Sequence, residues 1–136
     1  MPQEFVLHAQ LQKDTVTVGD LPLCRVLLSK DARFPWVILV PRQPDLREWH
    51  DLTAPDRAIL TEEIAALSKA MQAEWGADKT NVAALGNMVP QLHIHVVMRF
   101  TTDAAWPGPI WGVGTADAYE DAALAETLTR IRACFP

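Results

Sequence analysis

Two histidines stand two positions apart in an apolar segment, and this spacing suits chemistry on a shared ligand. His93 and His95 belong to the segment Gln91-Leu92-His93-Ile94-His95-Val96-Val97. If the segment is a strand, Gln91 and the two histidines point to one face, and the apolar residues between them point to the other. The two imidazoles would then lie within about 7 Å of each other, close enough to share one phosphoryl group or one metal ion.

Three interpretations of this pair are open on the spacing alone. The histidines could be structural residues on a solvent-facing strand. They could supply two ligands of zinc, iron or copper, but such a site needs a further ligand, and neither the other histidines, His8 and His50, nor the cysteines have a spacing that recruits them. Finally, a neutral imidazole is a competent nucleophile toward phosphorus, and a protonated neighbour can stabilise charge on the phosphate oxygens.

The residues before the pair favour the third interpretation. They read Gly86-Asn87-Met88-Val89-Pro90, in which Gly86 permits positive backbone angles and Pro90 makes a rigid entry into the strand. Backbone amides of this turn can face an anion that is bound beside His93. A purely structural strand has no need of this arrangement.

Short apolar runs on both sides of this motif predict the sheet that must position it. They are rich in β-branched and aromatic residues or alternate as strands do, and turn residues or prolines separate them. We expect strands at 15–18, 23–28, 36–40, 81–85 and 91–100. Residues Phe5 to Leu11 fit either a short helix or a strand.

Helical spacing is clearest from Thr53 to Trp75. Thr53 is a suitable N-cap, Pro55 lies in the first turn and Gly76 suits the left-handed residue that closes a helix. One face carries the apolar residues Leu60, Ile64, Leu67, Met71 and Trp75, so we expect this face to be buried. A second helix is expected from Asp117 to Cys134. The rigid aromatic loop from Ala105 to Gly112 could cover a core edge, pack across a dimer or wall a ligand pocket.

Length and composition restrict the class of protein. The chain has 136 residues, 49% of them hydrophobic, which suits one compact domain over residues 1–136. No apolar run approaches the roughly 18 residues of a membrane span, and the segment Met1-Pro2-Gln3-Glu4 lacks the features of a signal peptide. We therefore expect a cytoplasmic protein without a membrane anchor.

Charge and cysteine content narrow the partners. A net charge of −5 argues against binding to a nucleic-acid backbone but allows a small nucleotide, which backbone amides and a few side chains can hold. Cys24 and Cys134 lack the paired spacing of a zinc or redox motif, so we expect two reduced thiols.

The segment from Gly86 to Val97 resembles the signature of the histidine-triad (HIT) family, which reads His-φ-His-φ-His-φ-φ with φ apolar. Gln91 takes the place of the first histidine, His93 of the second and His95 of the third. Outside the signature, residues 23–42 resemble the paired strands of the family, residues 53–75 its long helix, and Trp106-Pro107 a feature that follows the signature strand.

This resemblance implies an α+β fold, with an antiparallel sheet of about five strands, one long central helix and a C-terminal helix, usually in a homodimer. It implies binding of a nucleoside phosphate without a metal or another cofactor. In the family the middle histidine attacks the α-phosphorus of a nucleotide ester, anhydride or phosphoramidate, and water or another acceptor resolves the nucleotidyl-histidine. His93 would take that role, and His95 would hydrogen-bond the phosphate oxygens.

The resemblance also assigns the surrounding residues. Asp31, or alternatively Lys30, stands where the family places a residue that contacts the ribose hydroxyls. Asn81 and Asn87 would line the phosphate and sugar region, together with the turn residues Gly86 and Met88.

Gln91 departs from the family pattern, because its amide can hydrogen-bond but cannot titrate. If the first histidine acts as an acid toward the leaving group, Gln91 cannot replace it in that role. If it only orients its neighbours, Gln91 can. A nucleotide-binding module with little turnover and a metalloprotein using the two histidines therefore remain alternatives to a hydrolase or transferase.

Overall fold

Five antiparallel strands form a single sheet in the computed structural model, which describes residues 4–136. The strands are β1 (Thr15–Asp20), β2 (Cys24–Ser29), β3 (Trp36–Pro41), β4 (Lys79–Ala83) and β5 (Ile94–Arg99). Their spatial order is β1-β2-β3-β5-β4, and every neighbouring pair is antiparallel. The expected α+β fold is confirmed. Met1 to Gln3, which belong to the segment examined for a signal peptide, lie outside the described residues.

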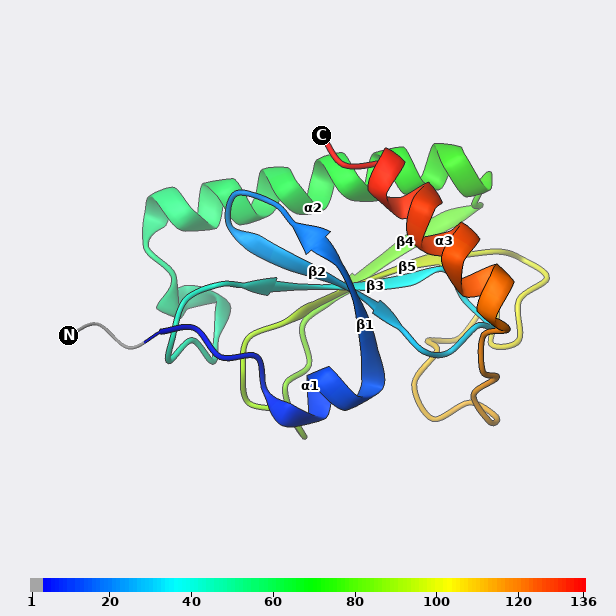
Figure 1. Ribbon diagram of the computed structural model, residues 1–136, viewed down its shortest axis with the longest axis horizontal. Helices are drawn as coiled ribbons and strands as arrows, with labels where there is room; N and C mark the ends of the chain where they lie inside the picture. Colours follow the sequence, from blue (N-terminus) through cyan, green and yellow to red (C-terminus); the bar gives the residue numbers. More distant parts are fainter. Residues whose placement is uncertain (1–3) are drawn as a thin grey trace.

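Helices cover the sheet unequally. They are α1 (Ala9–Asp14), α2 (Ala54–Trp75) and α3 (Asp121–Ala133), with a short 3-10 helix, η1 (Trp49–Asp51). Figure 1 shows α2 and α3 above the sheet and α1 below it, beside the loops that lead into β5. No helix in the described part of the chain is both long enough and apolar enough to cross a membrane.

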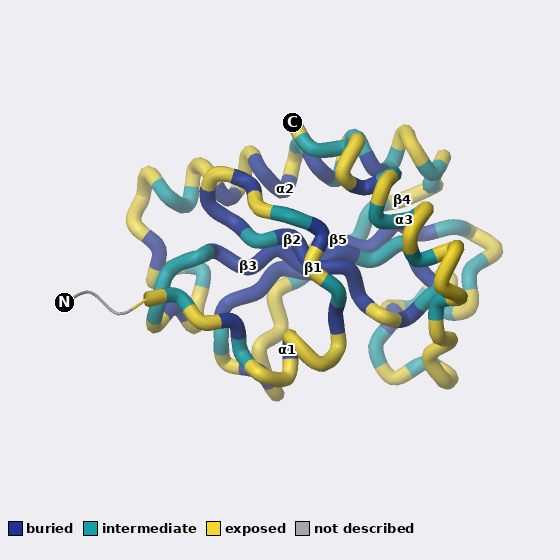
Figure 2. Tube along the Cα trace, viewed as in Figure 1, coloured by how far each residue is buried: buried dark blue, intermediate teal, exposed yellow. Residues whose placement is uncertain are grey.

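The long helix α2 forms as its sequence predicts. The Thr53 side chain accepts a hydrogen bond from the backbone N–H of Asp56, and Gly76 closes the helix with a left-handed φ of 63°. The expected apolar face packs into the main core, where it meets the side chains of Ile94, Val96 and Met98 from β5. Figure 2 shows the result as buried strands beneath a helix whose outer turns are exposed. Because alternate residues of β5 serve this core, His95 points to the opposite face.

Two predicted elements are shorter in the structure, because neighbouring segments capture their ends. The strand predicted at 91–100 begins only at Ile94, since the backbone N–H of Leu92 bonds to the carbonyl of Leu46 and pairing with β3 ends at Leu39 and Ile94. The last helix begins at Asp121 instead of Asp117. The turn after β2 holds Asp117 outside the helix, because the Asp117 carbonyl accepts from the backbone N–H of Ala32 and its N–H donates to the Asp31 carboxylate.

Smaller shifts affect two other elements. The fourth predicted strand lies at Lys79–Ala83, two residues before the expected 81–85. Within Phe5 to Leu11, only the last three residues are helical, because α1 begins at Ala9 with His8 as its N-cap.

A buried carboxylate joins α2 to the sheet, which the sequence did not reveal. Glu63 is buried, and its two carboxylate oxygens accept hydrogen bonds from the backbone N–H groups of Leu23 and Cys24, at 2.8 and 2.9 Å. These N–H groups stand where β2 begins. Burial, followed by the negative charge of Glu63, raises the pKa of the Cys24 thiol well above its ordinary range. Cys24 is therefore a free, buried thiol of low reactivity.

We predict that Glu63→Gln destabilises the protein, because an amide offers one acceptor where the carboxylate offers two. The expected loss in the free energy of unfolding is about 1–3 kcal/mol, measured by urea denaturation. Glu62→Gln is the matched control, since Glu62 is exposed on the same helix. Equal stability of the two variants would contradict a role for Glu63 in joining the layers.

Candidate active site

The two histidines of the motif lie together at the wall of a cavity. Their ring centroids are 5.0 Å apart and their planes stand at 72°. Each residue is only 7% exposed, and both line a cavity of about 420 Å³. The structure therefore excludes the first interpretation, in which the two histidines lie on a solvent-facing strand.

His93 is held in one tautomer by the main chain. Its Nδ1 lies 2.7 Å from the carbonyl oxygen of Gln91. A carbonyl can only accept, so Nδ1 carries the proton of the neutral ring and Nε2 carries a lone pair. A neutral imidazole in this state is a nucleophile at Nε2.

His95 is held in the opposite tautomer by an indole. Trp36 Nε1 lies 3.0 Å from His95 Nδ1, and an indole N–H can only donate, so Nδ1 is the acceptor and Nε2 carries the proton. Burial, helped by the charge of His93, lowers the pKa of His95 to about 4. The sequence left open a protonated imidazole beside His93, whereas this geometry makes His95 a neutral hydrogen-bond donor at Nε2.

The turn before the motif forms the rim of the same cavity. Gly86, Asn87 and Met88 all line it, and Gly86 has a φ of 73°, as its sequence context predicted. Within residues 4–136, the backbone N–H groups of Asn87 and Met88 have no hydrogen-bond acceptor. The Met88 side chain is 93% exposed at the edge. The rim therefore has backbone donors available for an anion.

The aromatic loop at 105–112 serves two of the three roles left open for it. Trp111 walls the cavity, with its ring centroid 5.3 Å from that of His95 and 6.5 Å from that of Trp36. Ile110 covers a core edge, where it packs with Phe34 and Val97.

A second cavity of about 580 Å³ adjoins the first, and the two share Asp14, Ser29, Trp36 and Trp111 in their walls. Lys30 and Asp31 both line this second cavity, but they are not equally available. Lys30 is exposed, whereas Asp31 is buried.

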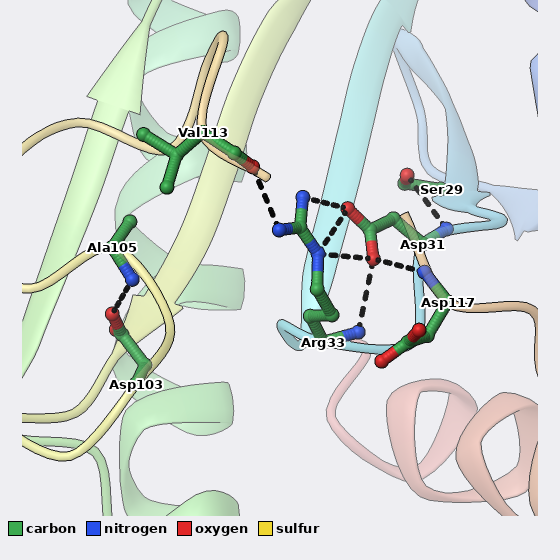
Figure 3. Close-up of polar contacts among 7 residues, drawn as sticks. All are labelled: Ser29, Asp31, Arg33, Asp103, Ala105, Val113 and Asp117. Atoms are coloured by element: carbon green, nitrogen blue, oxygen red, sulfur yellow. Dashed lines mark hydrogen bonds and ion pairs between the residues drawn. The ribbon is translucent and has the colours of Figure 1, made fainter. Parts of the chain in front are cut away.

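The Asp31 carboxylate already has several partners. It forms an ion pair with Arg33 and accepts a hydrogen bond from the backbone N–H of Asp117, as Figure 3 shows. Burial alone would raise the pKa of Asp31, but these hydrogen bonds outweigh burial and lower it. Asp31 therefore ties the turn after β2 to the segment before α3.

Asn81 is not among the residues that line the cavity of the histidines. It shares a face of the sheet with His95, but its Oδ1 accepts a hydrogen bond of 2.7 Å from Arg99 Nη1. Arg99 is buried and forms an ion pair with Asp103, which also accepts the backbone N–H groups of Phe100, Ala105 and Trp106. Figure 3 includes the bond to Ala105. In this structure Asn81 helps to hold the aromatic loop.

Gln91 also lies apart from the cavity that His93 and His95 line. Its side-chain amide contacts the N-terminal segment, where Nε2 donates to the carbonyl of Val6 and Oε1 accepts from the backbone N–H of His8, both at 2.9 Å. Of the residues predicted from the sequence, one cavity thus brings together His93, His95, Gly86, Asn87 and Met88. Lys30 and Asp31 line the adjoining cavity.

Sequence reasoning missed Trp36, Trp111, Ser29 and Leu11 as cavity residues. Local patterns carried no signal for them, except that the aromatic loop was noted as a possible wall. For a metal site, the structure has no group of three or more His, Cys, Asp or Glu side chains within residues 4–136 that could hold an ion.

Comparison with known proteins gives matches to one family. The family model described as the HIT domain matches residues 10–102, well over half of the chain. A search among curated proteins found no significant match.

Solved structures match over nearly the whole chain. A histidine triad protein from Bradyrhizobium japonicum is 44% identical, with a TM-score of 0.96 and coverage of 98% of this chain and 100% of that one. One from Marinobacter aquaeolei VT8 is 44% identical, with a TM-score of 0.95 and coverage of 98% and 97%. One from Sinorhizobium meliloti 1021 is 40% identical, with a TM-score of 0.94 and coverage of 96% and 97%. The chain therefore belongs to the histidine-triad (HIT) family.

Proposed function

We propose that this protein is a nucleotide hydrolase or nucleotidyl transferase that acts at the α-phosphorus through a covalent nucleotidyl-His93 intermediate. Membership of the HIT family supports a nucleotide-binding hydrolase or transferase in general. The observation that carries the finer proposal is the bond from His93 Nδ1 to the Gln91 carbonyl, which leaves a lone pair on Nε2 at the wall of a cavity.

In the first step, His93 Nε2 attacks the α-phosphorus and a bond forms between nitrogen and phosphorus. The bond from phosphorus to the leaving group breaks, and the leaving group departs with the electron pair and takes a proton from water. The ring of His93 becomes positively charged, and the Gln91 carbonyl stabilises that charge through the Nδ1 hydrogen bond. His95 donates its Nε2–H to a non-bridging phosphate oxygen, where negative charge develops.

In the second step, water or another acceptor attacks the same phosphorus. The bond from phosphorus to His93 Nε2 breaks, its electron pair returns to the ring, and the attacking oxygen releases its proton to solvent. The nucleophile is restored. Neither step requires a metal ion, since fixed hydrogen-bond donors supply the electrostatic stabilisation.

For the bound nucleotide, we propose that the phosphate lies against the free N–H groups of Asn87 and Met88, beside Gly86. The nucleoside extends into the adjoining cavity, where Lys30 and Ser29 offer polar groups. Contacts of Asp31 with ribose and of Asn81 with the sugar or phosphate stay predictions, because both side chains already have partners in this structure.

The central prediction concerns His93. Incubation with a radiolabelled adenylyl substrate and rapid quenching should trap a labelled protein adduct. His93→Ala should abolish the adduct and lower turnover by roughly three orders of magnitude or more, because the nucleophile is lost. His50→Ala is the matched control, since His50 is exposed on η1.

Retention of the labelled adduct in His93→Ala would contradict the assignment. If the wild-type protein releases no nucleotide from dinucleoside polyphosphates, nucleotide sugars or phosphoramidates, the enzymatic proposal fails. Tight binding of a nucleoside monophosphate in calorimetry would then favour the binding module. Stoichiometric zinc or iron in untagged protein would favour the metalloprotein.

A second prediction concerns the tautomer of His95. Nitrogen NMR should show Nδ1 unprotonated and Nε2 protonated, with no titration of His95 between pH 5.5 and 8, well above its pKa of about 4. Trp36→Phe removes the donor to Nδ1, so both tautomers become populated and turnover falls about five- to tenfold, as expected for one lost hydrogen bond. Trp75→Phe, at the far end of α2, controls for loss of an indole. Titration of wild-type His95 near its ordinary pKa would contradict this account.

We also propose a homodimer that forms along the open edge of β4. Val82 on this edge strand is 45% exposed, and Leu85 just beyond it is 49% exposed. An edge strand has unpaired backbone N–H and C=O groups that can pair with a second chain. Location in the cytoplasm stays a prediction from the sequence.

Light scattering should therefore give a dimer for the wild type and a monomer for Val82→Lys at micromolar concentration, because a charge on the edge opposes pairing. Ile59→Lys is the control, since Ile59 is 41% exposed on α2. A monomeric wild type would end the dimer proposal.

A further inference from the structure

Gln91 makes two hydrogen bonds that link segments far apart in the sequence. Its amide nitrogen donates to the Val6 carbonyl, and its amide oxygen accepts from the His8 N–H, each over 2.9 Å. These partners are a carbonyl and an N–H two residues apart on one extended backbone, so a planar amide meets them as a neighbouring strand would. Both functional atoms of the side chain are therefore used for contact with the N-terminal segment.

The N-terminal segment held by Gln91 continues into α1, which contributes a residue to the wall of the cavity that His93 and His95 line. His8 is the N-cap of α1, and its Nδ1 accepts a hydrogen bond from the backbone N–H of Gln10. One turn later, Leu11 is buried and lines the cavity that His93 and His95 share. Figure 1 shows α1 lying beside the loops that precede β5. The position of Leu11 thus depends on how the N-terminal segment is held.

Apolar packing holds this segment only in part. Leu7 and Leu11 are buried in a small core cluster and Phe5 packs against it, but Val6 is 71% exposed and contributes little burial. The Gln91 amide adds two hydrogen bonds on either side of Leu7, at Val6 and His8, to this apolar packing.

The main chain of the same residue holds the nucleophile, because the Gln91 carbonyl accepts the hydrogen bond from His93 Nδ1. The side chain of Gln91 therefore holds the segment before α1, while its main-chain carbonyl sets the tautomer of His93. A side-chain amide does not titrate, so it cannot act as an acid toward a leaving group, and the Gln91 amide lies outside the cavity.

We propose that Gln91 is a positioning residue: its side chain locks the N-terminal segment against the segment that precedes β5 and keeps Leu11 in the wall of the cavity that His93 and His95 line, without acting on the leaving group. This inference rests on the proposed function for the identity of the ligand. The role of the amide as a tether can be measured without any activity.

Two variants separate the two hydrogen bonds. Gln91→Glu keeps an acceptor for the His8 N–H but cannot donate to the Val6 carbonyl, whereas Gln91→Met preserves length and loses both bonds. We expect Gln91→Glu to weaken binding of adenosine monophosphate about five- to tenfold in calorimetry, as the loss of one hydrogen bond predicts, and Gln91→Met to weaken it at least as much, because it loses both. KM should rise in the same proportion. The value of kcat should change less than twofold.

Gln72→Met is the matched control. Gln72 donates a comparable side-chain hydrogen bond to the carbonyl of Ala77 at the end of α2, away from the cavity. Its loss should leave both binding and KM unchanged. A fall of kcat in the Gln91 variants with unchanged nucleotide affinity would overturn the proposal, because it would assign Gln91 to the chemical step.

A double-mutant cycle tests whether Gln91 acts through Leu11. Leu11→Ala and Gln91→Met should each weaken binding. The double variant should lose no more affinity than the single variant with the larger loss, because both substitutions disturb the same wall. Fully additive losses would contradict this route.

Amide hydrogen exchange keeps this inference separate from the proposed function. The His8 N–H should exchange at least tenfold faster in Gln91→Met, and the change should spread through α1. Unchanged exchange would refute the tether even if the protein is a nucleotide hydrolase. Faster exchange in a protein that binds no nucleotide would retain the tether and end the proposed function.

Discussion

In the antiparallel pairing of β3 with β5, Ile38 lies opposite His95 and Trp36 lies opposite Val97. This register places Trp36 and Ile38 on the face that carries His95, with the indole in diagonal reach of the imidazole. A shift of one residue would turn Trp36 toward α2 and leave His95 Nδ1 without its donor. The tautomer of His95, the aromatic wall of the cavity and the buried state of both histidines all depend on this one pairing.

The two histidines differ in chemistry although they are two residues apart. A carbonyl acceptor puts the proton of His93 on Nδ1, and an indole donor puts the proton of His95 on Nε2. Neighbouring rings in opposite tautomers offer one lone pair and one hydrogen-bond donor. That combination suits attack on phosphorus better than two equivalent imidazoles would, since one ring can form the bond while the other stabilises the developing charge.

Polar clusters behind the cavity hold its walls. Asp31 and Arg33 tie the turn after β2 to the segment before α3, and Arg99 with Asp103 holds the start of the loop that carries Trp111. Both pairs are well shielded from solvent, and hydrogen bonds from backbone N–H groups complete the coordination of each carboxylate. These two ion pairs therefore fix the positions of the loops around the cavity. The loops come from segments that are distant in the sequence.

The sequence by itself determined the fold class, the long helix and the presence of His93 and His95 side by side on one face of a strand segment. Those features depend on local periodicity, on helix caps such as Thr53 and Gly76, and on a short motif in which neighbouring residues carry the signal. Tertiary structure alone decided what surrounds the motif. Trp36 meets His95 through strand register, and Gln91 meets Val6 and His8 across more than eighty residues of chain. Such contacts have no local signature, because a side chain that can both donate and accept reveals its partners only when the chain has folded.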